Sequence, residues 1–413
     1  MTGSVAAVAA VNPSLGVTRG TALYVGALVG PGVLLVPSLA AEAAGPASIV
    51  AWAALLVLAA PLAITFAILG VRHPVGGGVS VYVREGIGDG AAAATGACFL
   101  TAVVIGGPAV ALVGGFYVAD LTGSGTVVAV AAAAAMFALV LCANAFGVRV
   151  SSGVQLALSA VLVLVIALAV GVALPSRAGD NWTPFAPHGW WSIGTAASIL
   201  VWLFIGWEAM AQLVGDFRDP GRDLPRAVAL AFVVVTLLYV GLAVATVTVT
   251  AGSGSTVPLA DLLEVGLGEA GRSGTVVLAV ALTMGTMNVY IGGAAKLAAA
   301  LARERALPAW LARDAGDVPR RPLFVLALAG AVLLPPLADG LLHADDLVRA
   351  TSACFITVYV LALGSAVRIL HGRPRAAAAI ALAMTAVVAA FSTTFLLVPA
   401  AAAAVALAFR RRS

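Results

Sequence analysis

The chain alternates long apolar runs with short segments that carry nearly all of its charged side chains. A helix needs about 20 apolar residues to cross a bilayer, so each long run predicts one membrane-spanning helix. About twelve transmembrane helices are expected, over residues 20–41, 47–70, 91–118, 126–147, 153–174, 190–214, 227–250, 274–297, 322–338, 350–367, 376–391 and 394–409. The last two share one run that is long for one helix and short for two, and a polar turn at residues 392–394 favours two.

The composition indicates where these helices lie. Hydrophobic residues make up 62% of the 413 residues and charged residues only 10%, whereas a soluble protein contains about 25% charged residues. A water-soluble core of this length cannot bury so much apolar surface, so the surplus must face lipid. The sequence therefore predicts an all-α polytopic membrane protein.

The arginines indicate the orientation of the chain. With twelve spans and a cytoplasmic N-terminus, 18 of the 21 arginines fall on the cytoplasmic side, and Arg177, Arg272 and Arg349 fall outside. Cytoplasmic loops are enriched in Lys and Arg, so the reverse orientation is strongly disfavoured. We expect a multi-pass protein of the inner (plasma) membrane with both termini in the cytoplasm.

Two of the predicted spans contain features that disrupt a helix. Residues 26–33 of the first span contain Gly26, Gly30, Pro31 and Gly32, which predict a break, or alternatively a simple proline kink. The sixth span places Glu208 beside a helix-loosening Gly206, deep in an apolar run. A carboxylate at that depth costs several kcal/mol unless it is paired, protonated or hydrated. Glu208 therefore marks a polar cavity, or is a structural carboxyl bonded to nearby backbone.

The two breaks occupy matching positions in two halves of the chain. The halves cover residues 16–174 and 190–369, with an external loop at 175–189 between them. A short cytoplasmic N-terminus (1–15) precedes them, and a two-helix hairpin with a basic tail (370–413) follows. Paired interrupted helices predict an inverted-repeat transporter with a binding site near the middle of the membrane. Helix N-termini there would attract an anion and free carbonyls a cation, so a zwitterion such as an amino acid suits both.

Four segments give the chain its resemblance to a known family. They are residues 26–37, residues 73–78 with Tyr82, residues 204–226 and residues 296–308. Together with the span count they resemble the amino acid–polyamine–organocation (APC) superfamily of transporters. Within it, the short length and the run from Gly30 to Pro37 are most similar to bacterial exporters of methionine and branched-chain amino acids.

The resemblance implies a 5+5 inverted repeat (LeuT-like) with broken helices 1 and 6, plus two C-terminal helices. It places the substrate carboxylate on the N–H groups of Gly30 and Gly32, and the ammonium on carbonyls near Val29, Phe204 and Ile205. Trp202 would wall or gate the side-chain pocket, and Glu208 is the candidate for proton coupling. The remaining pocket positions are Pro31, Ile105, Gly206, Met287 and Asn288. Pro31 departs from the family pattern, because it removes one N–H donor.

The same comparison bears on coupling and substrate. The fifth span has no lysine, which some relatives use in place of sodium, and Thr283 and Thr286 offer only a weak sodium site. The expected pocket is apolar with one carboxylate, which favours a neutral aliphatic amino acid over a cationic one. Proton-coupled efflux is therefore the leading hypothesis, and an uptake permease or exchanger of the same fold is the alternative. A non-transporting membrane scaffold is a remote third.

Several other functions lack the residues that they need. The three cysteines and four histidines are scattered, which fits neither a metal site nor a disulfide framework. One buried carboxylate is too few for an enzyme, and no phosphate loop or nucleic-acid-binding patch is visible. We expect no cofactor, no metal and no nucleic acid. The partners expected are a neutral amino acid, the proton and the lipid bilayer, with the oligomeric state left open.

Overall fold

The computed structural model describes residues 15–72, 79–148, 151–173, 175, 179–208, 217–250, 254–313 and 318–412. The glycine-rich segment 73–78 and the start of the charged loop, residues 209–216, lie outside the described residues, as do residues 1–14. Within the described ranges the chain is helical, and its one β feature is an isolated bridge between Leu15 and Phe217.

The first half of the chain contains α1 (Val17–Leu28), η1 (Pro31–Leu34), α2 (Val36–Ala44), η2 (Gly45–Ala47), α3 (Ser48–Arg72), α4 (Val79–Gly86), α5 (Asp89–Leu121), α6 (Thr126–Ala145) and α7 (Ser152–Ala173). The second half contains η3 (Gly179–Trp182), α8 (Ser192–Leu200), η4 (Val201–Phe204), α9 (Pro220–Thr250), α10 (Pro258–Arg303), η7 (Ala309–Ala312), α11 (Arg320–Leu333), α12 (Pro335–Ala338) and α13 (Ala344–Ile369). The C-terminal elements are α14 (Gly372–Ala390), η8 (Thr393–Leu396) and α15 (Leu397–Arg412).

The helices agree with the spans predicted from hydropathy. Ten helical segments of the described chain are long and apolar enough to cross a membrane. In the described part of the first and sixth predicted spans, no continuous helix reaches that length, because α1 ends at Leu28 and η4 ends at Phe204. The C-terminal run forms two helices, α14 and α15, which are joined at the polar turn where Thr393 has φ +44°.

The packing repeats between the two halves. The elements of the two halves correspond in span order. The broken segment α1–α2 matches α8–η4, α3 matches α9, α5 matches α10, α6 matches α11, and α7 matches α13. Helix α1 packs on α9 as α8 packs on α3, and α7 packs on α10 as α13 packs on α5. Five is an odd number of crossings, so the second half starts from the opposite side of the membrane. The fold is therefore an inverted repeat of five plus five helices.

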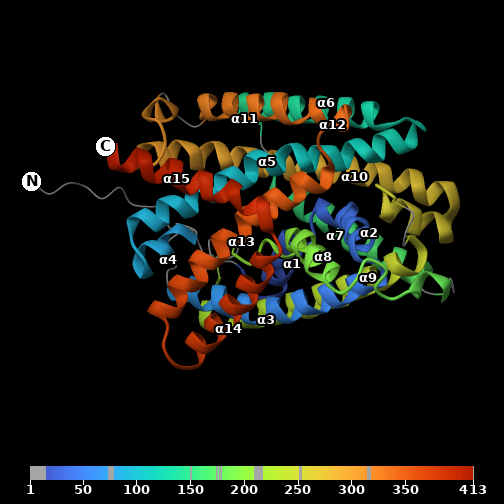
Figure 1. The fold of residues 1–413 in the computed structure, drawn as a ribbon, viewed down its shortest axis with the longest axis horizontal. Helices are drawn as coiled ribbons and strands as arrows, with labels where there is room; N and C mark the ends of the chain where they lie inside the picture. Colours follow the sequence, from blue (N-terminus) through green and yellow to red (C-terminus); the bar gives the residue numbers. More distant parts are fainter. Residues whose placement is uncertain are drawn as a thin grey trace, which may run out of the picture.

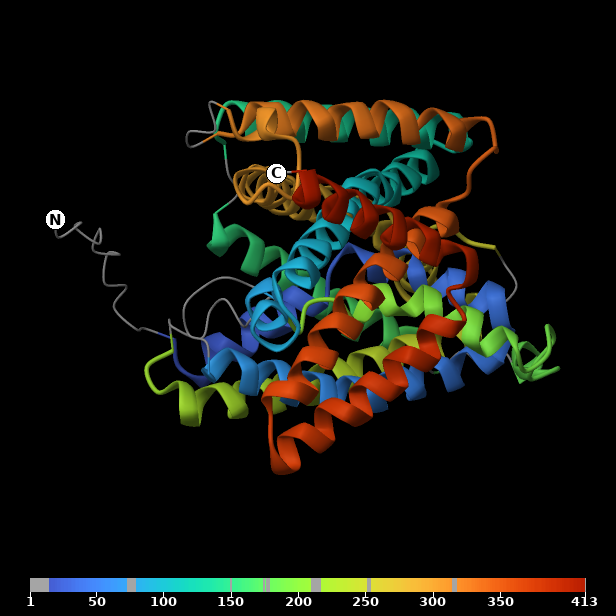
Figure 2. The ribbon, with the colours of Figure 1, turned by 60° about the vertical axis from the view of Figure 1, so that its left-hand side comes forward.

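The helices are arranged in layers around the two breaks (Figure 1). Helices α6 and α11 lie side by side along one face, and α3 and α14 lie along the opposite face. Both views place α1 and α8 between these layers (Figure 2). The interrupted segments are therefore surrounded by protein, which is where irregular backbone is tolerated in a membrane.

The bundle has two ends, which we name by the chain. At the N-terminal side, where α1 begins and α15 ends, Arg84 pairs with Glu304 at 2.9 Å and Arg410 with Asp89 at 3.8 Å. At the far side, the amide of Asn181 donates to the carbonyl of Thr248 at 2.7 Å. These contacts join segments that are distant in sequence, so they fix which helix ends lie together.

Candidate functional site

A cavity of about 1140 Å³ lies against both breaks. Gly30, Pro31 and Gly32 line it from the first broken helix, and Trp202, Ile205 and Glu208 from the sixth. The remaining walls come from α5, α7, α10 and α13. A cavity of this size has room for a small organic molecule, since typical ligand sites measure about 300–1,000 Å³.

The cavity extends toward the N-terminal side. Its lining reaches Ser80 near the start of α4, Thr95 and Gly96 in the first turns of α5, and Ala300 in the last turn of α10. All of these lie near the end of the bundle that holds the Arg84–Glu304 pair. The cavity therefore extends from the two breaks toward the N-terminal side of the bundle.

The first break exposes backbone to this cavity. The N–H of Gly30 donates to the carbonyl of Leu28 at 3.1 Å, and the helix resumes as η1 at Pro31. Gly32 follows Pro31 at the start of η1, where an N–H has no partner within the helix. Pro31 has no N–H at all. The backbone N–H of Gly32 is therefore the donor that the first break can offer to a ligand in the cavity.

The second break depends on Gly206. Its φ of +133° belongs to a region that side chains disfavour, and a Cβ at this position would lie 2.9 Å from the carbonyl oxygen of Ala27. Gly32 of the first break lies equally close to the second, since a Cβ there would lie 2.9 Å from Cδ2 of Leu203. The two breaks therefore touch each other, and glycine at each permits the contact.

Three buried tyrosines bond to carbonyls at the breaks. The hydroxyl of Tyr117 donates to Leu34 at 2.9 Å. The hydroxyl of Tyr239 lies 2.9 Å from the carbonyl of Leu28 and 2.8 Å from that of Leu203. The hydroxyl of Tyr359 donates to the carbonyl of Phe204 at 3.4 Å. An unsatisfied backbone group in the membrane costs several kcal/mol, so these hydroxyls stabilise the interrupted helices.

Glu208 lies at the end of the second break and is only 4% exposed. Its Oε2 accepts a hydrogen bond from the Gly206 N–H at 3.0 Å and another from the hydroxyl of Tyr359 at 2.5 Å. Glu208 also lines the cavity, so its carboxyl is held by protein on one side and reachable from the cavity on the other.

The cavity walls are mainly apolar. Phe99 and Phe355 form an edge-to-face pair with ring centroids 5.3 Å apart, next to Trp202. Gln155 donates to the hydroxyl of Thr286 at 3.4 Å on another wall. Among the described lining residues, Glu208 is the one acidic side chain and Lys296 the one basic side chain.

The structure brings together most of the residues that the sequence nominated. Gly30, Pro31, Gly32, Trp202, Ile205, Met287 and Glu208 all line the cavity. Five others are not among its described lining residues, namely Val29, Ile105, Phe204, Gly206 and Asn288. Asn288 instead donates to the carbonyl of Val148 at 3.2 Å, away from the breaks.

The sequence reasoning did not identify Tyr117, Tyr239 and Tyr359. Their hydroxyls reach the breaks from α5, α9 and α13, which are far away in sequence. A tyrosine inside an apolar run was the available signal, because a buried hydroxyl needs a partner.

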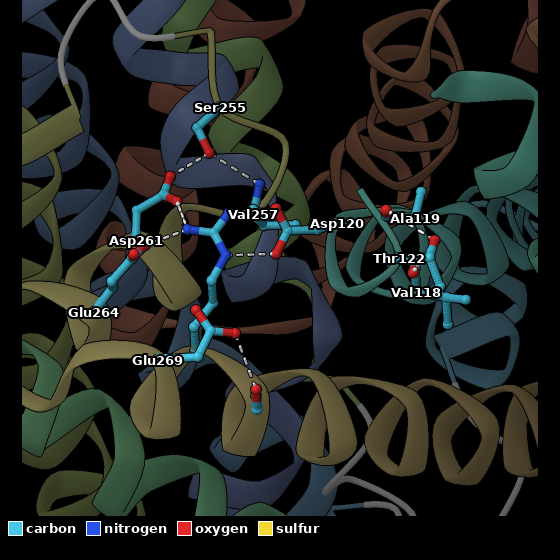
Figure 3. A network of polar contacts seen from close by, with 11 residues as sticks. Val118, Ala119, Asp120, Thr122, Ser255, Val257, Asp261, Glu264 and Glu269 are labelled. Carbon is cyan, nitrogen blue, oxygen red and sulfur yellow. Dashed lines mark hydrogen bonds and ion pairs between the residues drawn. The ribbon is translucent and has the colours of Figure 1, made fainter. Parts of the chain in front are cut away.

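A cluster of polar contacts lies at the far side of the bundle, and Figure 3 labels its acidic members Asp120, Asp261 and Glu264. Arg272 pairs with all three. Arg272, on α10, bonds through two nitrogens to Asp120 at the end of α5, and it also pairs with Asp261 and Glu264. Ser255 bonds to Asp261, and Ser38 of α2 donates to the Ser255 carbonyl. None of these residues lines the cavity. We refer to Asp120, Asp261, Glu264 and Arg272 as the outer cluster.

Two interrupted helices that meet beside one cavity, inside an inverted repeat, define a polytopic membrane transporter. The family model for amino acid permeases matches residues 15–410, so the chain belongs to the amino acid permease family, within the APC superfamily. It is a transporter and not an enzyme.

Two relatives match nearly the whole chain. An uncharacterized amino acid permease, YecA of Bacillus subtilis (strain 168), is 33% identical over 94% of this chain and 92% of its own length. The L-methionine/branched-chain amino acid exporter YjeH of Escherichia coli (strain K12) is 28% identical over 87% of each chain. A branched-chain amino acid permease, BcaP of Bacillus subtilis, is 24% identical over 53% of this chain and 51% of its own.

Proposed function

We propose that the chain exports neutral aliphatic amino acids, namely methionine and the branched-chain amino acids, across the inner membrane. The observation that carries the proposal is the cavity, in which two breaks offer backbone groups while the walls are apolar. Backbone N–H and C=O groups suit the ends of a zwitterion. Apolar walls suit an uncharged side chain, and the name of the relative YjeH agrees with this substrate class.

In this proposal the substrate lies between the two breaks. Its carboxylate binds the N–H of Gly32, because the N–H of Gly30 already bonds to Leu28. Its ammonium binds the carbonyl of Ile205, which is the one of the three expected carbonyl positions (Val29, Phe204 and Ile205) that lines the cavity, and its side chain lies against Trp202. The two halves, residues 16–174 and 190–369, rearrange around this fixed site in alternating access.

The orientation follows from the charges of the chain. We place the N-terminal side in the cytoplasm, because 18 of the 21 arginines belong to that side in the twelve-span topology. The cavity is then open to the cytoplasm, and the outer cluster closes the external side. This is the state in which an exporter loads its substrate.

Proton coupling is assigned to Glu208. It is the acidic residue of the described cavity lining, and it bonds directly to the backbone of the second break. A change in its protonation would alter the bond to the Gly206 N–H, and with it the shape of the substrate site. Protons moving inward would then drive amino acids outward.

An uptake permease or exchanger of the same fold is the alternative, because the direction of transport depends on the gradients applied. The deciding experiment loads cells with radiolabelled methionine, leucine, isoleucine or valine, with lysine as control. We expect several-fold faster loss of the aliphatic set when the protein is present, and no acceleration for lysine. A protonophore should abolish the difference. No effect on any of the four would contradict export, and opposed gradients in vesicles would then test uptake.

A further inference from the structure

We propose that Tyr239 is a positioning residue that locks the two broken helices into one unit. It lies on α9, is fully buried and belongs to neither broken helix. Its hydroxyl oxygen is 2.9 Å from the carbonyl of Leu28 and 2.8 Å from the carbonyl of Leu203. Leu28 ends α1, and Leu203 belongs to the last turn before the second break. One hydroxyl therefore reaches the end of both helices.

The Tyr239 hydroxyl has a single proton to donate, although two carbonyl oxygens lie close to it. A tyrosine hydroxyl has one O–H, so at any moment it donates to one carbonyl or shares its proton between the two. Both carbonyl oxygens lie within hydrogen-bond distance of this one hydroxyl, at 2.9 and 2.8 Å. Moving one break away from the other removes that shared donor from at least one of the carbonyls.

The ring of Tyr239 adds a second set of contacts. It packs edge-on against Trp52 of α3 at 5.3 Å and against Phe204 of η4 at 5.4 Å, measured between ring centroids. Edge-to-face pairs of this kind contribute beyond simple burial. Through one side chain, α9 is joined to α1, α3 and η4.

Tyr117 provides a matched control within the same chain. It is also fully buried, and its hydroxyl also bonds to a carbonyl beside the first break. It donates to one carbonyl, that of Leu34, and it also bonds to the backbone of Leu259 and Ala260 on α10, so its described partners lie outside the second break. Replacing either tyrosine by phenylalanine removes one oxygen and keeps the ring.

The test measures amide hydrogen exchange of the full-length protein in lipid nanodiscs. In Tyr239→Phe, we expect exchange at residues 28–30 and at residues 203–206 to accelerate together, by about five- to tenfold, which is the range for one lost hydrogen bond. In Tyr117→Phe, acceleration should be confined to residues 33–35 and to residues 259–260, whose backbone also bonds to the Tyr117 hydroxyl, and residues 203–206 should be unchanged. Acceleration at one break alone in Tyr239→Phe, or at neither, would overturn the proposal.

A measurement on the unmodified protein covers the case in which Tyr239→Phe does not fold. At increasing denaturant, the amides of Gly30 and Ile205 should exchange with the same dependence, because they open as one unit. Different dependences would refute the lock. Both measurements need no substrate, so they remain decisive even if the proposed export activity is wrong.

Discussion

The contact between the two breaks depends on the backbone conformation of single glycines. Gly206 combines a positive φ with a close approach to the Ala27 carbonyl, whereas Gly30 has φ −107° and no atom within 4 Å of an added Cβ. Both are glycines at a break, but only the first is required by local sterics. The same substitution at the two positions therefore separates a folding role from a role in the cavity.

We predict that Gly206→Ala destabilises the protein by about 1–3 kcal/mol, because the residue must hold a strained φ and displace the Ala27 carbonyl. Gly30→Ala should leave stability within about 0.5 kcal/mol of the parent but reduce export, because its methyl group enters the cavity. Thermal unfolding in detergent measures the first effect and efflux the second. Equal stability of the two variants would show that the contact between the breaks carries no strain.

Glu208 is the second residue whose role is open to a direct test. Both of its hydrogen bonds go to Oε2, so Glu208→Gln can keep them through its amide oxygen while losing the ability to ionise. We predict normal folding, together with a loss of the pH dependence of efflux. Tyr359→Phe is the control, because it removes one of the two bonds and leaves the carboxyl. A pH profile identical to that of the parent would remove Glu208 from coupling.

At the scale of whole elements, the sequence predicted more of the fold than of the site. Hydropathy located the helices, and glycine and proline located the first break, because both act locally. The partners of the freed carbonyls were not predictable in this way. Tyr117, Tyr239 and Tyr359 bond to the carbonyls of Leu34, Leu28 and Phe204 across 83, 211 and 155 residues of sequence. Only three-dimensional packing brings their hydroxyls to the breaks.

The outer cluster is an element-scale feature that connects the end of α5 with two parts of α10, because Asp261 and Glu264 precede the kink at Gly268 and Arg272 follows it. One guanidinium serves three carboxylates there, so the cluster without Arg272 would hold three mutually repelling charges. We predict that Arg272→Gln loosens the far side and increases labelling of Ser38→Cys by an impermeant maleimide several-fold, in a background without native cysteines. Arg349→Gln is the control, because Arg349 stacks on Phe395 instead. Unchanged labelling in Arg272→Gln would contradict a closing role.

At the scale of the whole molecule, the two ends of the bundle differ in structure and in charge. The cavity reaches the N-terminal side, where the arginine-rich loops and the end of α15 lie, and the outer cluster lies at the other end. The positive-inside rule concerns charge alone, and it uses no information on the cavity. If the N-terminal side lies in the cytoplasm, as we propose, then this structure is the state that loads substrate from inside the cell.

That claim can be tested through topology. A protease-cleavable tag placed after the C-terminal arginines should be cut in inverted membrane vesicles and protected in right-side-out vesicles, because those arginines resist translocation. A tag inserted beside Trp190, in the loop on the far side, should show the opposite pattern and serves as the control. If the C-terminal tag were cut from outside, the cavity would face the exterior. The same structure would then represent the loading state of an uptake permease.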